Sequence, residues 1–193
     1  MKITAARTKP DLTWLKTYYY LRFVIAAAWV ALAFTIGKTS SPLAAAMLVV
    51  YPAWDALANF LDASRSGGLV HNKSQLLNFI VSIVTAIAVA ATLPQGMHPV
   101  LQVFGVWAVL AGLFQLLTGV RRWKFYRAQW AMILSGAQSG LAGIHMLSKA
   151  AGTAEVGIID IAPYAAFGAL YFLISAISLT VSAARLRSKE AAA

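Results

Sequence analysis

Three polar side chains inside an apolar stretch have the types and spacing that could do chemistry. Asp55, Asn59 and Asp62 are separated by four and three positions, so a helix over residues 43–64 presents all three on one face. Asp55 falls near the middle of this stretch. A charged Asp at the centre of a membrane helix costs about 2.5–3.5 kcal/mol on insertion scales, so we expect this face to turn away from lipid.

Two interpretations of Asp55 follow from its position. In the first, burial favours the neutral carboxyl, and Asp55 is a protonated group that is hydrogen-bonded to a neighbouring helix. In the second, Asp55 senses protons or cations, or lies in a solute path. Asp62 lies three residues before Arg65, and a local ion pair is the simpler interpretation of that residue.

Small residues form a second pattern, in two apolar stretches that a short connector joins. The small residues are Gly105, Gly112 and Gly119 in the first stretch, and Ser135, Gly136, Ser139, Gly140 and Gly143 in the second. Because small residues let the backbones of membrane helices approach closely, residues 103–147 predict a tightly packed helical hairpin. This seam is compatible with packing within one chain and with packing between subunits of a homo-oligomer.

The remaining polar residues give no signature of catalysis. Gln115 and Gln138 lie inside apolar stretches, where interhelical hydrogen bonding is the simplest role. The three histidines, His71, His98 and His145, are too scattered for a metal site, although a fall in external pH could protonate the last two. No serine-hydrolase, zinc-protease or phosphate-loop motif occurs, so we expect neither an enzyme nor a cofactor or metal.

The composition assigns these residues to a membrane protein. The chain has 193 residues, of which 60% are hydrophobic and only 11% are charged, and the apolar residues come in long blocks. The sequence predicts an all-α polytopic protein with a basic arm at 1–17, a tail at 185–193, and six transmembrane helices at about 18–37, 43–64, 76–94, 99–120, 130–147 and 161–184. A cleaved signal peptide is the alternative interpretation of the first apolar block.

The basic residues predict the orientation of these helices. Fourteen of the sixteen lie on the side that carries both termini, and only Lys38 and Lys149 lie on the other side. This asymmetry places both termini in the cytoplasm, as expected for a bacterial inner-membrane protein. A basic connector either attracts anionic lipid headgroups or only sets the topology, and its residues are Arg121, Arg122, Lys124 and Arg127. Because the formal charge of +10 sits at the ends of apolar blocks, we expect membrane lipids as partners and not nucleic acid.

The same residues suggest an internal repeat. Arg65, Arg121 and Arg185 end the second, fourth and sixth predicted spans, at the spacing of a helical hairpin. Residues 56 positions apart also match in type, namely Tyr51 with Trp107 and Asn59 with Gln115. The third copy matches less well, since aligning Gly168 with Gly112 loses the register of the arginines. We therefore predict three in-out hairpins.

The pattern of residues 103–187 resembles the HdeD-like family of small bacterial membrane proteins. The resemblance is carried by GVWAVLAGLFQLLTGVRRWK, WAMILSGAQSGLAGI and PYAAFGALYFLISAISLTVSAARLR. It implies a six-helix inner-membrane protein that is associated, through the founding member, with acid resistance and that has no established biochemical activity. The first hairpin, with Asp55 and Asp62, departs most from this pattern. The function we expect is therefore a non-enzymatic role in acid or stress tolerance, and the alternative is a small transporter or channel with Asp55 in its path.

Overall fold

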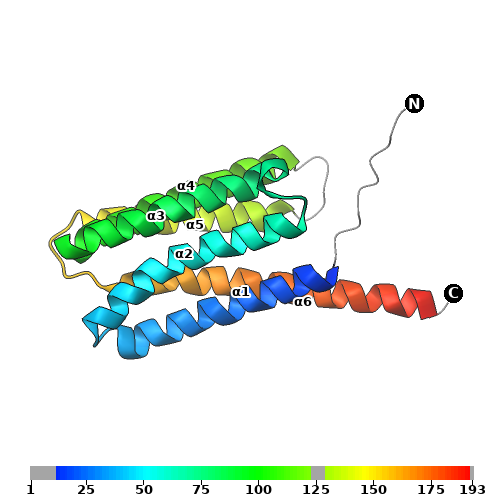
Figure 1. Ribbon diagram of the computed structural model, residues 1–193, viewed down its shortest axis with the longest axis horizontal. Coiled ribbons are helices and arrows are strands. Elements are labelled where there is room, and N and C mark those ends of the chain that lie inside the picture. Colours follow the sequence, from blue (N-terminus) through cyan, green and yellow to red (C-terminus); the bar gives the residue numbers. More distant parts are fainter. Residues whose placement is uncertain (1–11, 123–128, 192–193) are drawn as a thin grey trace.

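The computed structural model describes residues 12–122 and 129–191, which form an elongated bundle of helices (Figure 1). The long helices are α1 (Leu12–Leu32), α2 (Ser41–Arg65), α3 (Lys73–Thr92), α4 (Met97–Arg122), α5 (Gln129–Ala150) and α6 (Ala162–Ala191). The π-helix η1 (Ala33–Gly37) directly follows α1. Three other short helical segments lie between the long helices, namely η2 (Leu69–His71), η3 (Leu93–Gln95) and η4 (Ile158–Asp160). The predicted all-α class is confirmed.

Five helices of the described residues are long and apolar enough to span a membrane: Thr13–Gly37, Ser41–Arg65, Lys73–Gln95, Met97–Leu117 and Ala162–Arg185. A helix of about 20 residues rises about 30 Å, the thickness of the hydrocarbon layer. The fifth predicted span, at 130–147, lies within the 22-residue helix α5. The first helix begins at Leu12 and not near residue 18, so the last part of the predicted basic arm, 1–17, is helical.

The helices pack as three antiparallel pairs, and these pairs differ from the three predicted in-out hairpins. The extensive contacts are α4 with α5, α1 with α6, and α2 with α3, whereas α1 and α2 make few backbone contacts and so do α5 and α6. The predicted hairpin at 103–147 is one of these pairs. The α1–α6 pair joins helices from opposite ends of the described chain, and the start of α1 and the end of α6 lie at the same end of the bundle (Figure 1).

Small residues explain why these pairs form. A Cβ atom on Gly112 would lie 2.5 Å from the carbonyl oxygen of Gly136, and one on Gly143 would lie 2.5 Å from that of Gly105. The two backbones are therefore in direct contact, and the seam packs within one chain. The other pairs carry buried small residues at the same seven-residue spacing, namely Ala56 and Ala63 in α2, Ala169 and Ala176 in α6, and Ala26 in α1 with Ala33 at the start of η1.

These alanines also bear on the register of the predicted third repeat. Ala176 lies 64 residues after Gly112 and is fully buried, which is the same offset that relates Arg185 to Arg121. A Cβ atom on Gly168, the alternative match, would have the hydroxyl oxygen of Tyr51 as its nearest neighbour, at 3.9 Å. Gly168 therefore does not lie at a tight backbone contact. The structure therefore favours the register that keeps the arginines aligned.

The apolar core is concentrated in one half of the bundle. We call the end with the start of α1, the end of α6 and the connector 66–72 the terminal end, and the opposite end, with connectors 38–40 and 151–157, the far end (Figure 1). The largest fully buried apolar side chains lie toward the far end, and they are Leu48, Val89, Val100, Leu101, Phe104 and Ile161. Toward the terminal end, polar contacts such as the hydrogen bond between Gln75 and Asp62 also join the helices.

Large side chains connect the α1–α6 pair to the rest of the bundle. The Trp29 indole of α1 donates a hydrogen bond to the Met47 carbonyl of α2 at 2.9 Å, and its ring lies 4.8 Å from that of Tyr51. On the other side, the ring of Trp107 in α4 lies 5.9 Å from that of Tyr164 in α6. The pair is thus docked through side chains, whereas the helices within a pair meet through their backbones.

Candidate functional site

The candidate site lies between α1, α2 and α3, near the middle of the membrane-spanning segments. Arg22 belongs to the span Thr13–Gly37, whose middle is residue 25, and Asp55 belongs to Ser41–Arg65, whose middle is residue 53. At 1.5 Å per residue, each lies within about 5 Å of the middle of its helix. Charged groups at this depth are costly and therefore need partners.

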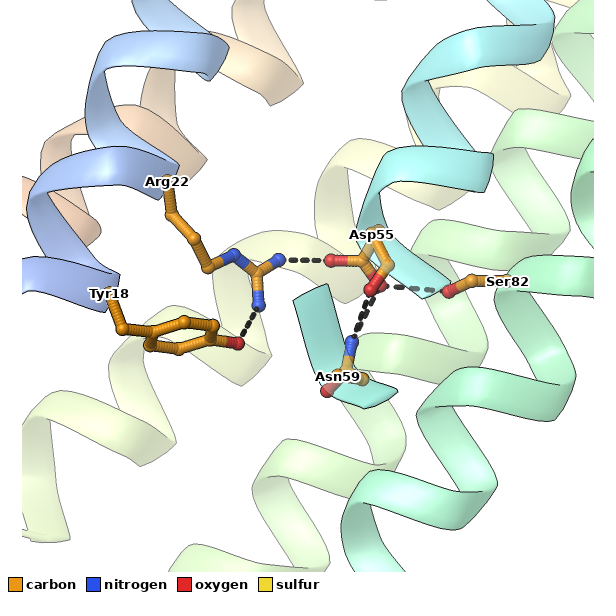
Figure 2. Close-up of polar contacts among 5 residues, drawn as sticks. All are labelled: Tyr18, Arg22, Asp55, Asn59 and Ser82. Atoms are coloured by element: carbon orange, nitrogen blue, oxygen red, sulfur yellow. Dashed lines mark hydrogen bonds and ion pairs between the residues drawn. The ribbon is translucent and has the colours of Figure 1, made fainter. Parts of the chain in front are cut away.

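Arg22 and Asp55 are partners of each other (Figure 2). The guanidinium Nη2 donates to the Oδ1 atom of Asp55, and the two side chains are only 13% and 19% exposed. The second carboxylate oxygen accepts hydrogen bonds from Ser82 in α3 at 2.8 Å and from Asn59 at 3.0 Å. Both oxygens of Asp55 are therefore bound to donors, one of them charged, and three helices meet at this carboxylate.

Aromatic side chains complete the surroundings of Arg22. Its Nη1 atom donates to the Tyr18 hydroxyl at 3.0 Å, and the centre of the guanidinium lies 4.1 Å from the centroid of the Phe172 ring in α6. The expected hydrogen bond between Asp55 and a neighbouring helix is present. The neighbouring helix supplies Ser82, but Arg22 makes the interaction an ion pair.

Sequence reasoning missed Arg22 as a member of this site. It counted Arg22 only among the fourteen basic residues on the side that carries both termini. A signal was available, because Arg22 is the only basic residue inside the predicted span 18–37 and Asp55 is the acidic residue nearest the middle of 43–64. Two such charges at similar depth are expected to pair, because pairing reduces the cost of burying either one.

The accessible part of Asp55 faces the interior of the bundle. The lipid-facing stripe of α2 contains Val50, Leu57 and Phe60, which are 42–59% exposed. At about 100° per residue, Asp55 points about 140° or more away from each of them. The exposed fifth of its side chain is therefore on the interior side of α2, next to Arg22.

The other acidic residue of α2 does not form the predicted local ion pair. Asp62 accepts a hydrogen bond from Gln75 in α3 at 3.1 Å, and no ion pair joins it to Arg65 in the described residues. The guanidinium of Arg65 instead lies 4.7 Å from the ring centroid of Trp14. Asn59 lies between the two acids on the same face and contacts Asp55, as its spacing predicts.

Polar side chains of α4 and α5 also form hydrogen bonds between helices. Gln115 donates to the Ser135 hydroxyl at 3.1 Å, and Ser139 donates to the Ala108 carbonyl at 3.0 Å, so both bonds join α4 to α5. Gln138 accepts a bond from Tyr171 in α6 at 2.8 Å. These contacts are the interhelical hydrogen bonds that the sequence predicts.

One glycine of the seam differs from the others. A Cβ on Gly140 would meet no atom within 4 Å, although its backbone nitrogen lies against Gly112. A Cβ on Gly105 would lie 2.8 Å from the Leu147 side chain. Gly119 lies in α4, but its immediate surroundings are outside what the structure describes.

Other residues that the sequence analysis selected are either outside the described residues or away from this site. Lys124 and Arg127 of the basic connector are outside the described residues, as are the side chains of Arg121 and Arg122. His98 is bonded through Nδ1 to the Ala150 carbonyl at 3.0 Å, near the far end. Among the described residues, no three His, Cys, Asp or Glu side chains come together in a way that could hold a metal ion.

Comparison with known proteins gives one match. Residues 77–148 match the family model described as a short repeat of unknown function, DUF308. The chain gives no significant match to a curated protein or to a solved structure. The matched segment covers most of α3, all of α4 and most of α5, including the α4–α5 seam. Residues 77–148 of this membrane protein are thus similar to a DUF308 repeat, the family to which HdeD-like membrane proteins belong, in agreement with the resemblance seen in the sequence.

Proposed function

We propose that this chain is a multi-pass protein of the bacterial inner membrane, with both termini in the cytoplasm, that supports tolerance of acid or another stress without catalysing a reaction. The observation that carries the proposal is the DUF308 match in a bundle of apolar helices. The stress role comes from the resemblance to HdeD-like proteins, and the orientation from the unequal distribution of basic residues.

The candidate site supports a role without catalysis. Both oxygens of the Asp55 carboxylate already accept hydrogen bonds, from Arg22, Ser82 and Asn59, so neither is presented as a general base. The site in this form holds three helices together.

The stress role is tested by deleting the gene in its native host and measuring survival after exposure to low external pH. We expect survival to fall and to return when the wild-type chain is expressed. Equal survival of the deleted and parent strains under acid and other stresses would contradict the role. A modified lipid or quinone that accumulates only in cells with the protein would contradict the absence of catalysis.

A transporter or channel is the second candidate, and one observation favours it. Asp55 is 19% exposed on the interior side of its helix, near the middle of the bundle, where solute and ion pathways bear charged side chains. Flux of protons or radiolabelled solutes into liposomes that contain the purified protein separates the two candidates. Transport predicts flux that Asp55→Asn abolishes, and the first proposal predicts no flux above that of empty liposomes.

A further inference from the structure

The surroundings of the Arg22–Asp55 pair are different on its two sides. Toward the far end, the bundle is closed by Leu48, Leu101 and Phe104, which are fully buried, and by the ring of Tyr51 packed against Trp29 and Trp107. This packing is dense and apolar, so a polar solute would not approach from that end.

Toward the terminal end, polar groups continue along the same face of α2. Asn59 follows Asp55 by one turn, and Asp62 follows by another, where it is bonded to Gln75. On α1, the Tyr18 hydroxyl lies one turn from Arg22 in the same direction. The polar side of the pair, marked by this row of side chains, is therefore turned toward the terminal end.

The two helices that carry the pair are held together mainly by side chains. Over their whole length α1 and α2 have few backbone contacts, and Arg22 and Asp55 bridge them through their side chains (Figure 2). Separating these side chains does not require separating two packed backbones. A solute of a few atoms could therefore enter between the two charges.

The charges restrict which solutes could enter. A ligand with only a negative charge would pair with Arg22 and leave Asp55 unpaired, and one with only a positive charge would do the reverse. An unpaired buried charge is strongly unfavourable, so a ligand between the two residues needs both charges. Arg22 also has donor capacity left, because its buried Nε has no hydrogen-bond partner in the described residues.

We propose that Arg22 and Asp55 form a binding site for a small zwitterion, entered from the terminal end, in which Arg22 binds the carboxylate of the ligand and Asp55 binds its ammonium group. Tyr18 and Ser82, which bond to the two charged residues in the closed form, hold them in place. The Phe172 ring, 4.1 Å from the guanidinium, keeps Arg22 facing the site when the ligand separates it from Asp55. This site goes beyond the stress role, since bound ligand could be sensed or transported.

The test measures thermal unfolding of the purified full-length protein in detergent, followed by tryptophan fluorescence. The probes are glycine, β-alanine and proline, and the single-charge controls are sodium acetate and methylammonium chloride at equal ionic strength. At a concentration far above its Kd, at least one zwitterion is expected to raise the unfolding midpoint by roughly 5 °C. The single-charge controls should raise it by much less.

The variant that tests the site is the double substitution Arg22→Gln with Asp55→Asn. It removes both charges together, so it leaves no unpaired buried charge and is expected to fold. The matched control is Lys149→Gln with Asp160→Asn, which neutralises the ion pair near the far end. The zwitterion-induced shift should disappear in the first double variant and be unchanged in the second.

Three outcomes would overturn the proposal: no shift with any of the zwitterions, an equal shift with acetate or methylammonium, or a shift that the first double variant retains. If that variant does not fold, titration calorimetry on the wild type decides between binding and no binding of the same probes. Because binding is measured without cells, a negative survival experiment would contradict the proposed stress role and leave this site intact.

Discussion

The guanidinium of Arg22 pairs with the carboxylate of Asp55, 33 positions later in the chain, near the middle of two helices whose backbones barely touch. The pair therefore connects the α1–α6 unit to the α2–α3 unit at a place where close backbone packing does not. Its partners Ser82 and Tyr18 extend the connection to α3 and along α1. The ion pair therefore holds these two helix pairs together, whether or not the site also binds a ligand.

The first prediction concerns the energy of this pair. Arg22→Gln leaves the Asp55 charge without its partner, and Asp55→Leu does the same to Arg22, so each is expected to lower stability by up to about 3–5 kcal/mol. The double substitution Arg22→Gln with Asp55→Asn should cost less than either, because no charge remains unpaired. Unfolding in a denaturing detergent series measures these differences. Independent, additive losses would show that the two residues do not interact.

The second prediction concerns the α4–α5 seam. Gly112→Ala and Gly136→Ala should each lower stability by roughly 1–3 kcal/mol, because the new Cβ atoms would lie 2.5 Å and 2.8 Å from backbone oxygens. Gly140→Ala is the matched control in the same helix, since its Cβ would meet no atom within 4 Å. The measurement is the thermal midpoint in detergent. If Gly140→Ala is as destabilising as Gly136→Ala, the helices pack in another register.

The third prediction concerns the pairing of the helices. A circular permutant that joins the end of α6 to the start of α1, and opens the chain between Gly152 and Gly157, keeps all three helix pairs contiguous. We expect it to insert into the membrane and to unfold at a midpoint close to that of the parent, because its packing is unchanged. A permutant with the same join but opened at Gly140 interrupts α5 and is the control. Failure of the first permutant to fold would contradict the α1–α6 pair as a unit.

The fourth prediction concerns orientation. The unequal distribution of basic residues predicts that Gln95 lies outside and Lys124 in the cytoplasm. Reporter fusions that are active only in the cytoplasm should therefore be inactive at Gln95 and active at Lys124. Equal activity at both sites would be incompatible with six spans.

The amino-acid sequence by itself determined the class of the protein and the approximate position of each helix. Long apolar blocks can only satisfy their backbone polar groups in lipid by forming helices, so composition was sufficient. The seven-residue spacing of Gly105 and Gly112 was also sufficient to indicate a close helix contact, because only small residues permit it. The shared face of Asp55 and Asn59 followed from helical periodicity alone.

Only the tertiary structure decided which helices form pairs and which charges meet. A helix can pair with the helix before it or with the helix after it in the chain. The order of the apolar blocks does not distinguish these two arrangements. The structure joins α1 to α6, which are the first and last helices, and so turns the predicted in-out hairpins into a different set of pairs. The same arrangement brings Arg22 to Asp55. The sequence places the two charges at similar depth, but their meeting also depends on the rotation and packing of two separate helices, which local sequence does not encode.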